Sequence, residues 1–192
     1  MLEEYNDICA FHEKFELAYD GSMRALPRDY VEFRSSFLFE EASEYIRAYV
    51  VDSRAGMLDA LVDLAYVGIG TVYLHGFRPR PWSMSPLHVS PDLAGNINAV
   101  YPVICENIER YRRAAILGAT QPGLEVSREA IHDVIFVARH AAIEIHHFQF
   151  DEAWRRVHAA NMKKVRRATK RSGSYDVAKP KGWVAPDLKD LV

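Results

Sequence analysis

Five acidic residues, spread over two apolar stretches, are the residues of this chain best suited to chemistry. The first stretch, FLFEEASEYIRAY, carries Glu40, Glu41 and Glu44. On a helix these glutamates are three or four positions apart, so all three can project from one side. The nearest bases, Arg34 and Arg47, stand at the margins and not between the acids. No lysine or arginine is therefore interposed between the glutamates to relieve their repulsion.

A second acidic pair follows in the stretch MLDALVDLAYV. Asp59 and Asp63 are four positions apart, again on one helical face, and apolar residues surround them on nearly every side. An ionised carboxylate in apolar surroundings is costly unless it takes up a proton or meets a cation. The pair therefore predicts a site that needs one or the other.

Two antiparallel helices joined near Asp52 and Ser53 would bring the two acidic groups together. The combined set offers only oxygen ligands, without nearby histidine or cysteine, which suits Mg²⁺ or Mn²⁺ better than zinc. Divalent ions held by carboxylates commonly serve phosphate chemistry. The alternative is a solvated helix face, the usual fate of a single E-x-x-E. Two such groups on consecutive apolar helices are less common than one, and the residues alone leave the metal site and the solvated face both open.

The rest of the pattern predicts an all-α protein. Apolar residues recur at helical spacing, and no stretch shows sustained alternation bounded by hairpin turns. Another helix is predicted to start near Pro91, where a missing N–H does no harm. The main helices are predicted at about residues 3–18, 29–50, 53–75, 96–117, 127–148 and 151–171. Residues 78–91 and the tail after 171 are rich in Pro, Gly and Ser and are predicted to be irregular.

Composition narrows the class of protein. The 192 residues are about half hydrophobic and a quarter charged, which argues against a disordered or membrane protein. The longest uncharged apolar run, residues 64–74, is shorter than the roughly 18–20 residues of a membrane span. Cys9 and Cys105 suggest neither a disulfide framework nor a metal motif, which fits a reducing compartment. The start is too acidic for a secretory signal. A cytoplasmic protein is expected.

Several stretches resemble one enzyme group. EEASE, DALVDLAYVGIGTVYLHG and VHAANMKKV resemble the all-α nucleoside triphosphate pyrophosphohydrolases, which include the MazG-like and phosphoribosyl-ATP pyrophosphohydrolase-like proteins. FHEKFE and KPKGWVAPDL are similar to the first helix and the ending of phage and bacterial members. The resemblance implies one domain over residues 1–192, a MazG-like helical bundle. Residues from about 79 to 146 would form an inserted helical pair that compact members lack.

The resemblance also implies a set of metal ligands. Glu41 and Glu44 match the E-x-x-E ligands, and Asp63 matches the aspartate that closes the second motif. Many members have glutamate three residues before that aspartate, where this chain has Ala60, so Asp59 is expected to supply the fourth ligand.

Further roles follow from the same resemblance. Glu40 would act as a base or orient the attacking water, and Asn161 and Lys164 match residues that face the nucleotide. Lys179 would meet phosphate, while Trp183 would flank the base or ribose. The structural alternatives are an exposed helix residue, a solvated basic face and an aromatic plug that holds down the tail.

The implied reaction is Mg²⁺-dependent hydrolysis of a nucleoside triphosphate between the α- and β-phosphates, with Mn²⁺ as a substitute. Similarity to phage-type members favours a deoxynucleotide-pool enzyme acting on dGTP or another purine, in the host cytoplasm if phage-encoded. Members of the group assemble as homodimers or homotetramers, so one of these states is expected. Neither a membrane nor a stable nucleic-acid complex is expected as a partner.

Two rival functions remain open. Glu129 with His132 and Glu144 with His147 form two E-x-x-H motifs, as in ferritin-like di-metal bundles. Both fall on one predicted helix, whereas di-metal bundles place them on facing helices. The second rival is a nucleic-acid-binding module built on the basic residues 155–171, although that segment lacks interleaved aromatics and the net charge is −2.

Overall fold

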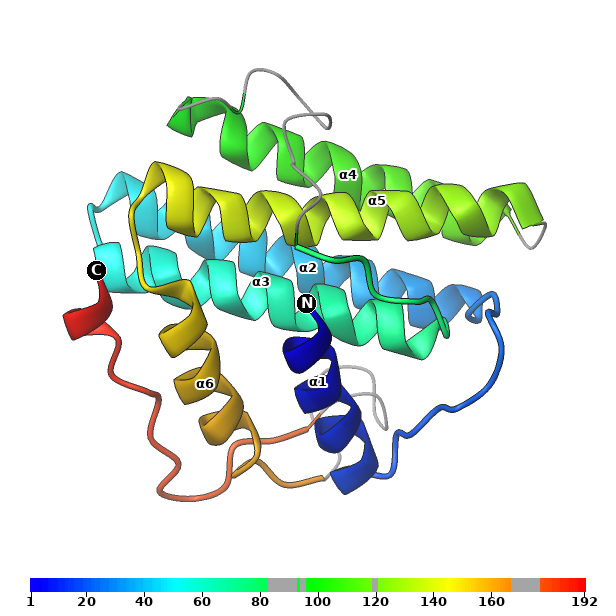
Figure 1. The fold of residues 1–192 in the computed structure, drawn as a ribbon, viewed down its shortest axis with the longest axis horizontal. Coiled ribbons are helices and arrows are strands. Elements are labelled where there is room, and N and C mark those ends of the chain that lie inside the picture. Colours follow the sequence, from blue (N-terminus) through cyan, green and yellow to red (C-terminus); the bar gives the residue numbers. More distant parts are fainter. Residues whose placement is uncertain (83–92, 94–95, 119–120, 167–176) are drawn as a thin grey trace.

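Helices form nearly all of the regular secondary structure in the described residues. The computed structural model describes residues 1–82, 93, 96–118, 121–166 and 177–192 (Figure 1). Its α-helices are α1 (Leu2–Lys14), α2 (Arg28–Val50), α3 (Arg54–Leu74), α4 (Ile97–Leu117), α5 (Gln121–His140) and α6 (Phe150–Asn161). A π-helical turn, η3 (Ala141–Ile145), continues α5, and a 3-10 turn, η4 (Lys189–Leu191), lies near the end. The predicted all-α class is confirmed.

The helices form two antiparallel hairpins with a further pair beneath them. The α2–α3 hairpin packs against the α4–α5 hairpin, mainly through contacts of α3 with α5 and of α2 with α4. Helices α1 and α6 pack against α3 from the other side and run across it (Figure 1). Helix α3 therefore has neighbours on both sides and forms the centre of the bundle.

The burial pattern of α3 explains its central place. Every residue from Met57 to Leu74 is buried except Asp59 and Asp63. A helix that is apolar all round must be covered on all sides. Its length and composition would also allow it to cross a membrane, but 89% of the relevant window is buried inside the bundle, as expected for a core helix. Beyond its first turn, α3 is open only at the two aspartates.

Helix ends differ from the prediction in two places. Helix α1 ends at Lys14 and not near residue 18, because Glu16 adopts a positive φ of 55° and Leu17 N–H donates to the His12 carbonyl at 2.8 Å. Helix α6 ends at Asn161 and not near residue 171. Beyond it, Val165 pairs with Ala178 in an antiparallel bridge. The start predicted near Pro91 lies outside the described residues.

The predicted helix over residues 127–148 begins earlier and does not remain α-helical. From Ala141 the chain widens into η3, in which His146 N–H donates to the Ala141 carbonyl at 2.9 Å. The wider turn sets the His146 ring 3.0 Å from the Tyr45 hydroxyl and stacks it on Phe148. His147 then leaves the helix with a φ of 58°. A specific contact with α2 thus accounts for the change.

The crossing of α3 and α5 depends on Gly68. A Cβ at this position would lie 2.6 Å from Cγ1 of Ile135, which is closer than real contacts allow. We expect Gly68→Ala to lower the free energy of unfolding by about 1–2 kcal/mol, because overpacking outweighs the gain in helix propensity. Urea denaturation would measure the change. In a double-mutant cycle with Ile135→Ala the two costs should be strongly non-additive, and simple additivity would contradict this contact.

Candidate active site

A cavity of about 430 Å³ lies between α1, α2, α3 and the two segments that meet at the Val165–Ala178 bridge. Helices α2 and α3 each contribute one stripe of side chains at spacings of three or four, and the helices are antiparallel, so the two stripes run side by side. The α2 stripe is Tyr30, Arg34, Phe37, Glu40, Glu41 and Glu44, and the α3 stripe is Asp59, Asp63, Tyr66, Val67 and Gly70. Among the described lining residues, the cavity therefore has a carboxylate end and an end without acids.

The predicted acids all line the carboxylate end. Glu41 is buried, Glu40 is half-buried and Glu44 is exposed, while Asp59 and Asp63 face them from α3 and are half-buried. As they stand, no three His, Cys, Asp or Glu side chains in the described residues are close enough to hold a metal ion. Side-chain rotations would be needed for these carboxylates to share an ion.

The electrostatics of the carboxylate end favour a cation. Burial raises the pKa of Asp63 to about 7, and the charge of Asp59 adds to the rise. Burial likewise raises the pKa of Asp59, and Glu44 contributes to it. Lys164 and Lys179 act in the opposite direction on both aspartates but do not cancel the shift. Since a nearby positive charge favours the ionised form, this set of oxygen donors fits a hard divalent ion.

Two lysines cover the carboxylate end from the C-terminal part of the chain. Val165 and Ala178 exchange two backbone hydrogen bonds, of 2.9 and 2.8 Å. Lys164 and Lys179 flank this pair on opposite strands, so they stand directly across from each other and project to the same side. Both line the cavity. The bridge thus supplies paired cations opposite the carboxylates.

Asn161 is the last residue of α6 and also lines the cavity, although only 5% of it is exposed. Its side chain hydrogen-bonds to the hydroxyl of Tyr66, which also lies 3.1 Å from Nδ1 of His158. These contacts fix the position of the amide. Asn161 is therefore a preorganised polar group next to Asp63 and not an exposed helix residue.

Trp183 lies outside the cavity lining. Its indole N–H donates to the Ala160 carbonyl at 2.9 Å, and the Lys179 ammonium lies 4.5 Å from its ring centroid. Trp183 thus anchors the C-terminal segment to α6 and holds Lys179 through a cation–π contact. This position corresponds to the structural alternative for Trp183, an aromatic plug.

Three residues at the end without acids were not predicted as site residues. His12, Arg34 and Gly70 line the cavity from α1, α2 and α3. The sequence did carry one signal, because Arg34 lies seven residues before Glu41 and therefore on the same helical face. Their convergence depends on how α1 packs on the α2–α3 hairpin, which periodicity does not predict.

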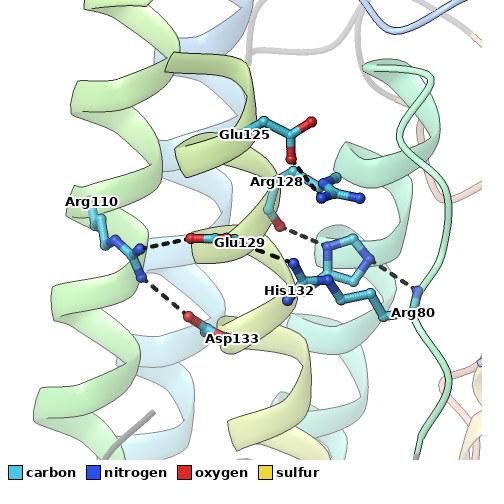
Figure 2. A network of polar contacts seen from close by, with 7 residues as sticks. All are labelled: Arg80, Arg110, Glu125, Arg128, Glu129, His132 and Asp133. Atoms are coloured by element: carbon cyan, nitrogen blue, oxygen red, sulfur yellow. Dashed lines mark hydrogen bonds and ion pairs between the residues drawn. The ribbon is translucent and has the colours of Figure 1, made fainter. Parts of the chain in front are cut away.

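The two E-x-x-H motifs do not form a metal site. Both ring nitrogens of His132 serve backbone groups, because Nδ1 lies 2.7 Å from the Arg128 carbonyl and Nε2 accepts from Arg80 N–H at 3.2 Å (Figure 2). Glu129 pairs with Arg110 and Arg80 in the same network. Glu144 and His147 are exposed near the far end of this long helical segment. The ferritin-like alternative therefore lacks its ligands in the described structure.

The basic segment is largely engaged with acids of the same chain. Arg155 and Arg156 pair with Glu152, Arg156 also pairs with Asp190 at 2.7 Å, and Arg166 pairs with Glu16 at 2.6 Å. Residues 167–171 lie outside the described part of the chain. The described arginines thus form ion pairs within the chain, which weakens the nucleic-acid alternative.

The protein is an all-α bundle, and its cavity places carboxylates from two adjacent helices opposite lysines. These features make it a candidate for the class of enzymes that carry out divalent-metal-assisted phosphate chemistry. Residues 8–83 match the family model of phosphoribosyl-ATP pyrophosphohydrolase. This segment therefore resembles the MazG-like nucleotide pyrophosphohydrolases, and the match supports a hydrolase acting on acid anhydrides. Searches of curated proteins and of solved structures gave no match. The matched segment contains all the carboxylates but not Asn161, Lys164 or Lys179.

Proposed function

We propose that this protein hydrolyses a nucleoside triphosphate between the α- and β-phosphates, with release of a monophosphate and pyrophosphate. The observation that carries the proposal is the single cavity lined both by carboxylates from α2 and α3 and by Lys164 and Lys179. A triphosphate is too negative to approach five carboxylates unless cations lie between them. The two lysines line the same cavity, so they could neutralise the phosphate charge that the metal ions leave.

Glu41, Glu44, Asp59 and Asp63 are the proposed ligands of Mg²⁺, with Mn²⁺ as a substitute. When bound, such ions would neutralise phosphate oxygens and make a water molecule at the site more acidic. Glu40 stands beside Glu41 in the lining and is half-buried, so it is the proposed base that orients the attacking water and takes its proton. Lys164 and Lys179 stabilise the charge that develops on the departing pyrophosphate. Asn161 is proposed to donate its amide to the phosphate or ribose.

The test is hydrolysis of a panel of ribo- and deoxynucleoside triphosphates with Mg²⁺, with separate detection of pyrophosphate and orthophosphate. Pyrophosphate should appear in equal amount to the monophosphate, and activity should be lost in EDTA and return with Mg²⁺ or Mn²⁺. Direct release of orthophosphate would exclude cleavage of the α–β bond. The resemblance to phage-type members supports a purine deoxynucleotide such as dGTP as the preferred substrate.

The lysine pair makes a separate prediction. Lys164→Ala and Lys179→Ala should each lower kcat/KM by about 10- to 100-fold, because a charge-assisted hydrogen bond contributes about 1.5–3 kcal/mol. The loss should appear with triphosphates and be much smaller for binding of a nucleoside without phosphates. Lys189→Ala is a matched control, because Lys189 is exposed on η4. Unchanged kcat/KM in both cavity variants would remove the lysines from the mechanism.

We further propose that α4 and α5, which follow the matched segment, form the inserted helical pair and that the protein assembles as a homodimer or homotetramer. The exposed apolar side chains of Leu117 and Val126 near the turn between α4 and α5 support an interface there. Light scattering coupled to gel filtration would measure the mass. A monomer at micromolar concentration would contradict the assembly.

A further inference from the structure

The end of the cavity without acids is built to hold a flat, uncharged group. Along α3, Gly70 lies seven residues beyond Asp63, which is about 10 Å at a rise of 1.5 Å per residue. That distance is comparable to the reach of a sugar and a base from their phosphate. The lining at this end includes Phe11, Tyr30 and Phe37. If the phosphates lie at the carboxylate end, the base of the nucleotide must lie here.

His12 offers a hydrogen-bond acceptor at this end. Its Nδ1 lies 2.8 Å from the Ile8 carbonyl oxygen, so Nδ1 must carry the proton and donate it. Burial lowers the pKa of His12 to about 4, so the ring is neutral near pH 7. In this tautomer Nε2 has a lone pair and accepts. The ring is held in place by Tyr73, with centroids 4.6 Å apart, and by Phe11.

Arg34 offers hydrogen-bond donors beside that acceptor. Its guanidinium donates through Nε to the Thr71 hydroxyl at 3.1 Å and through Nη2 to the Val67 carbonyl at 2.6 Å. Both partners belong to α3, so the plane of the guanidinium is fixed by the core helix. An arginine carries five N–H donors and no acceptor. Arg34 therefore presents a cation, held in a set orientation, to the cavity that it lines.

Gly70 brings the donor and the acceptor together. A Cβ at this position would lie 3.1 Å from Nη2 of Arg34 and 3.4 Å from Cε1 of His12. The absent side chain thus lets the Arg34 guanidinium and the His12 ring pack closely against α3 and lie beside each other at the cavity wall. A ligand edge at this wall meets a donor and an acceptor at once.

We propose that Arg34 and His12 select nucleotides whose base presents a carbonyl oxygen beside a ring N–H, as guanine, hypoxanthine, uracil and thymine do. This inference rests on the proposed function and specifies its substrate class. The carbonyl oxygen accepts from Arg34, and the adjacent ring N–H donates to Nε2 of His12. Adenine and cytosine present an amino group in place of the oxygen, which would set a donor against the buried cation. They should therefore be disfavoured.

The experiment compares substrates that differ only in this edge. The pairs dITP with dATP and dUTP with dCTP match in size and sugar, and dGTP with dITP isolates the 2-amino group. In both matched pairs the full-length protein should give a kcat/KM about 10- to 100-fold higher for the oxo base, since one well-placed polar pair discriminates by about 1–3 kcal/mol. Equal values within both pairs would overturn the proposal.

Variants assign the selectivity to the two residues. Arg34→Gln and His12→Phe should each reduce the dITP to dATP ratio towards one, mainly by lowering the value for dITP. Gly70→Ala should reduce it too, because a methyl group would displace the Arg34 guanidinium and the His12 ring, and this variant keeps both polar groups. Arg28→Gln, at the exposed start of the same helix as Arg34, is the matched control. A ratio that stays at its original value in all three folded cavity variants would also overturn the proposal.

A binding measurement separates this inference from the hydrolysis itself. Calorimetric titration with dIMP and dAMP in the presence of Mg²⁺ reports on the base without any turnover. If no triphosphate is hydrolysed but dIMP binds at least ten times more tightly than dAMP, the proposed reaction fails and the base subsite stands. If pyrophosphate is released equally from dITP and dATP, the reaction stands and the base subsite fails. Absence of both turnover and binding would reject both.

Discussion

Replacing Asp63 by asparagine is expected to lower kcat/KM for nucleoside triphosphate hydrolysis by about 10³-fold or more, the scale seen when a preorganised electrostatic group is lost. Burial and the charge of Asp59 raise the pKa of Asp63 to about 7, so its ionised form needs a nearby cation. Asparagine keeps the shape but loses the negative charge that would hold a cation. Steady-state kinetics with pyrophosphate detection measures the effect.

Stability should change in the opposite direction, which separates this result from unfolding. Asp63→Asn removes repulsion between neighbouring acids, so the metal-free variant should resist heat at least as well as the original protein. It should also lose most of the increase in Tm that Mg²⁺ gives the original protein. Asp52→Asn, at the exposed turn between α2 and α3, is the matched control. If Asp63→Asn retained full turnover, the metal assignment would be wrong.

Acid should unfold this protein over a narrow range of pH. Burial lowers the pKa of His12, His75 and His132 to about 4 each. Between about pH 4 and 6.5 the unfolded chain therefore binds protons that the folded chain does not, so stability is lost as the pH falls through this window. Three such groups contribute a slope of about 4 kcal/mol per pH unit near pH 5, at about 1.36 kcal/mol each, and Asp63, whose raised pKa has the opposite effect, reduces it by about one such share.

Urea midpoints measured from pH 7 to pH 5 would test this slope. His75 is a suitable probe, because Nδ1 lies 2.9 Å from the Arg24 carbonyl and Nε2 lies 3.0 Å from the Tyr111 hydroxyl. His75→Gln should reduce the slope by one histidine's share, about 1.36 kcal/mol per pH unit, although it also lowers stability at pH 7. His147→Asn is the control, because His147 is exposed and asparagine tolerates its positive φ. A stability that stays constant from pH 6.5 to pH 5 would contradict the buried neutral histidines.

The bundle and its acidic cavity wall could be predicted because they depend on short-range pattern. The spacing of Glu41 and Glu44 and of Asp59 and Asp63 places each pair on one helical face, and the short turn between the helices makes them antiparallel. The structure shows these acids lining one cavity, as the sequence indicated. Local spacing and one short connection are sufficient for that inference.

Features that depend on packing between distant segments were not predictable in the same way. The end of α6 at Asn161 follows from pairing of Val165 with Ala178, which competes with continued helix. Nothing in the basic run around Lys164 indicates that partner. The meeting of His12 with Arg34 over Gly70 also requires three helices to cross at one point. The one sequence signal for these site residues was a polar residue, such as His12 or Arg34, among apolar neighbours.

The Val165–Ala178 bridge shows that the matched segment alone does not contain the whole candidate site. The segment that matches the family model carries every acid among the described residues that line the cavity. The opposing lysines, Lys164 and Lys179, come from about one hundred positions later in the chain. A fragment limited to the matched stretch would keep the acidic half and repel any triphosphate. The positive charge of the cavity wall therefore depends on the folded chain as a whole, in which two backbone hydrogen bonds hold Lys164 and Lys179 across from each other.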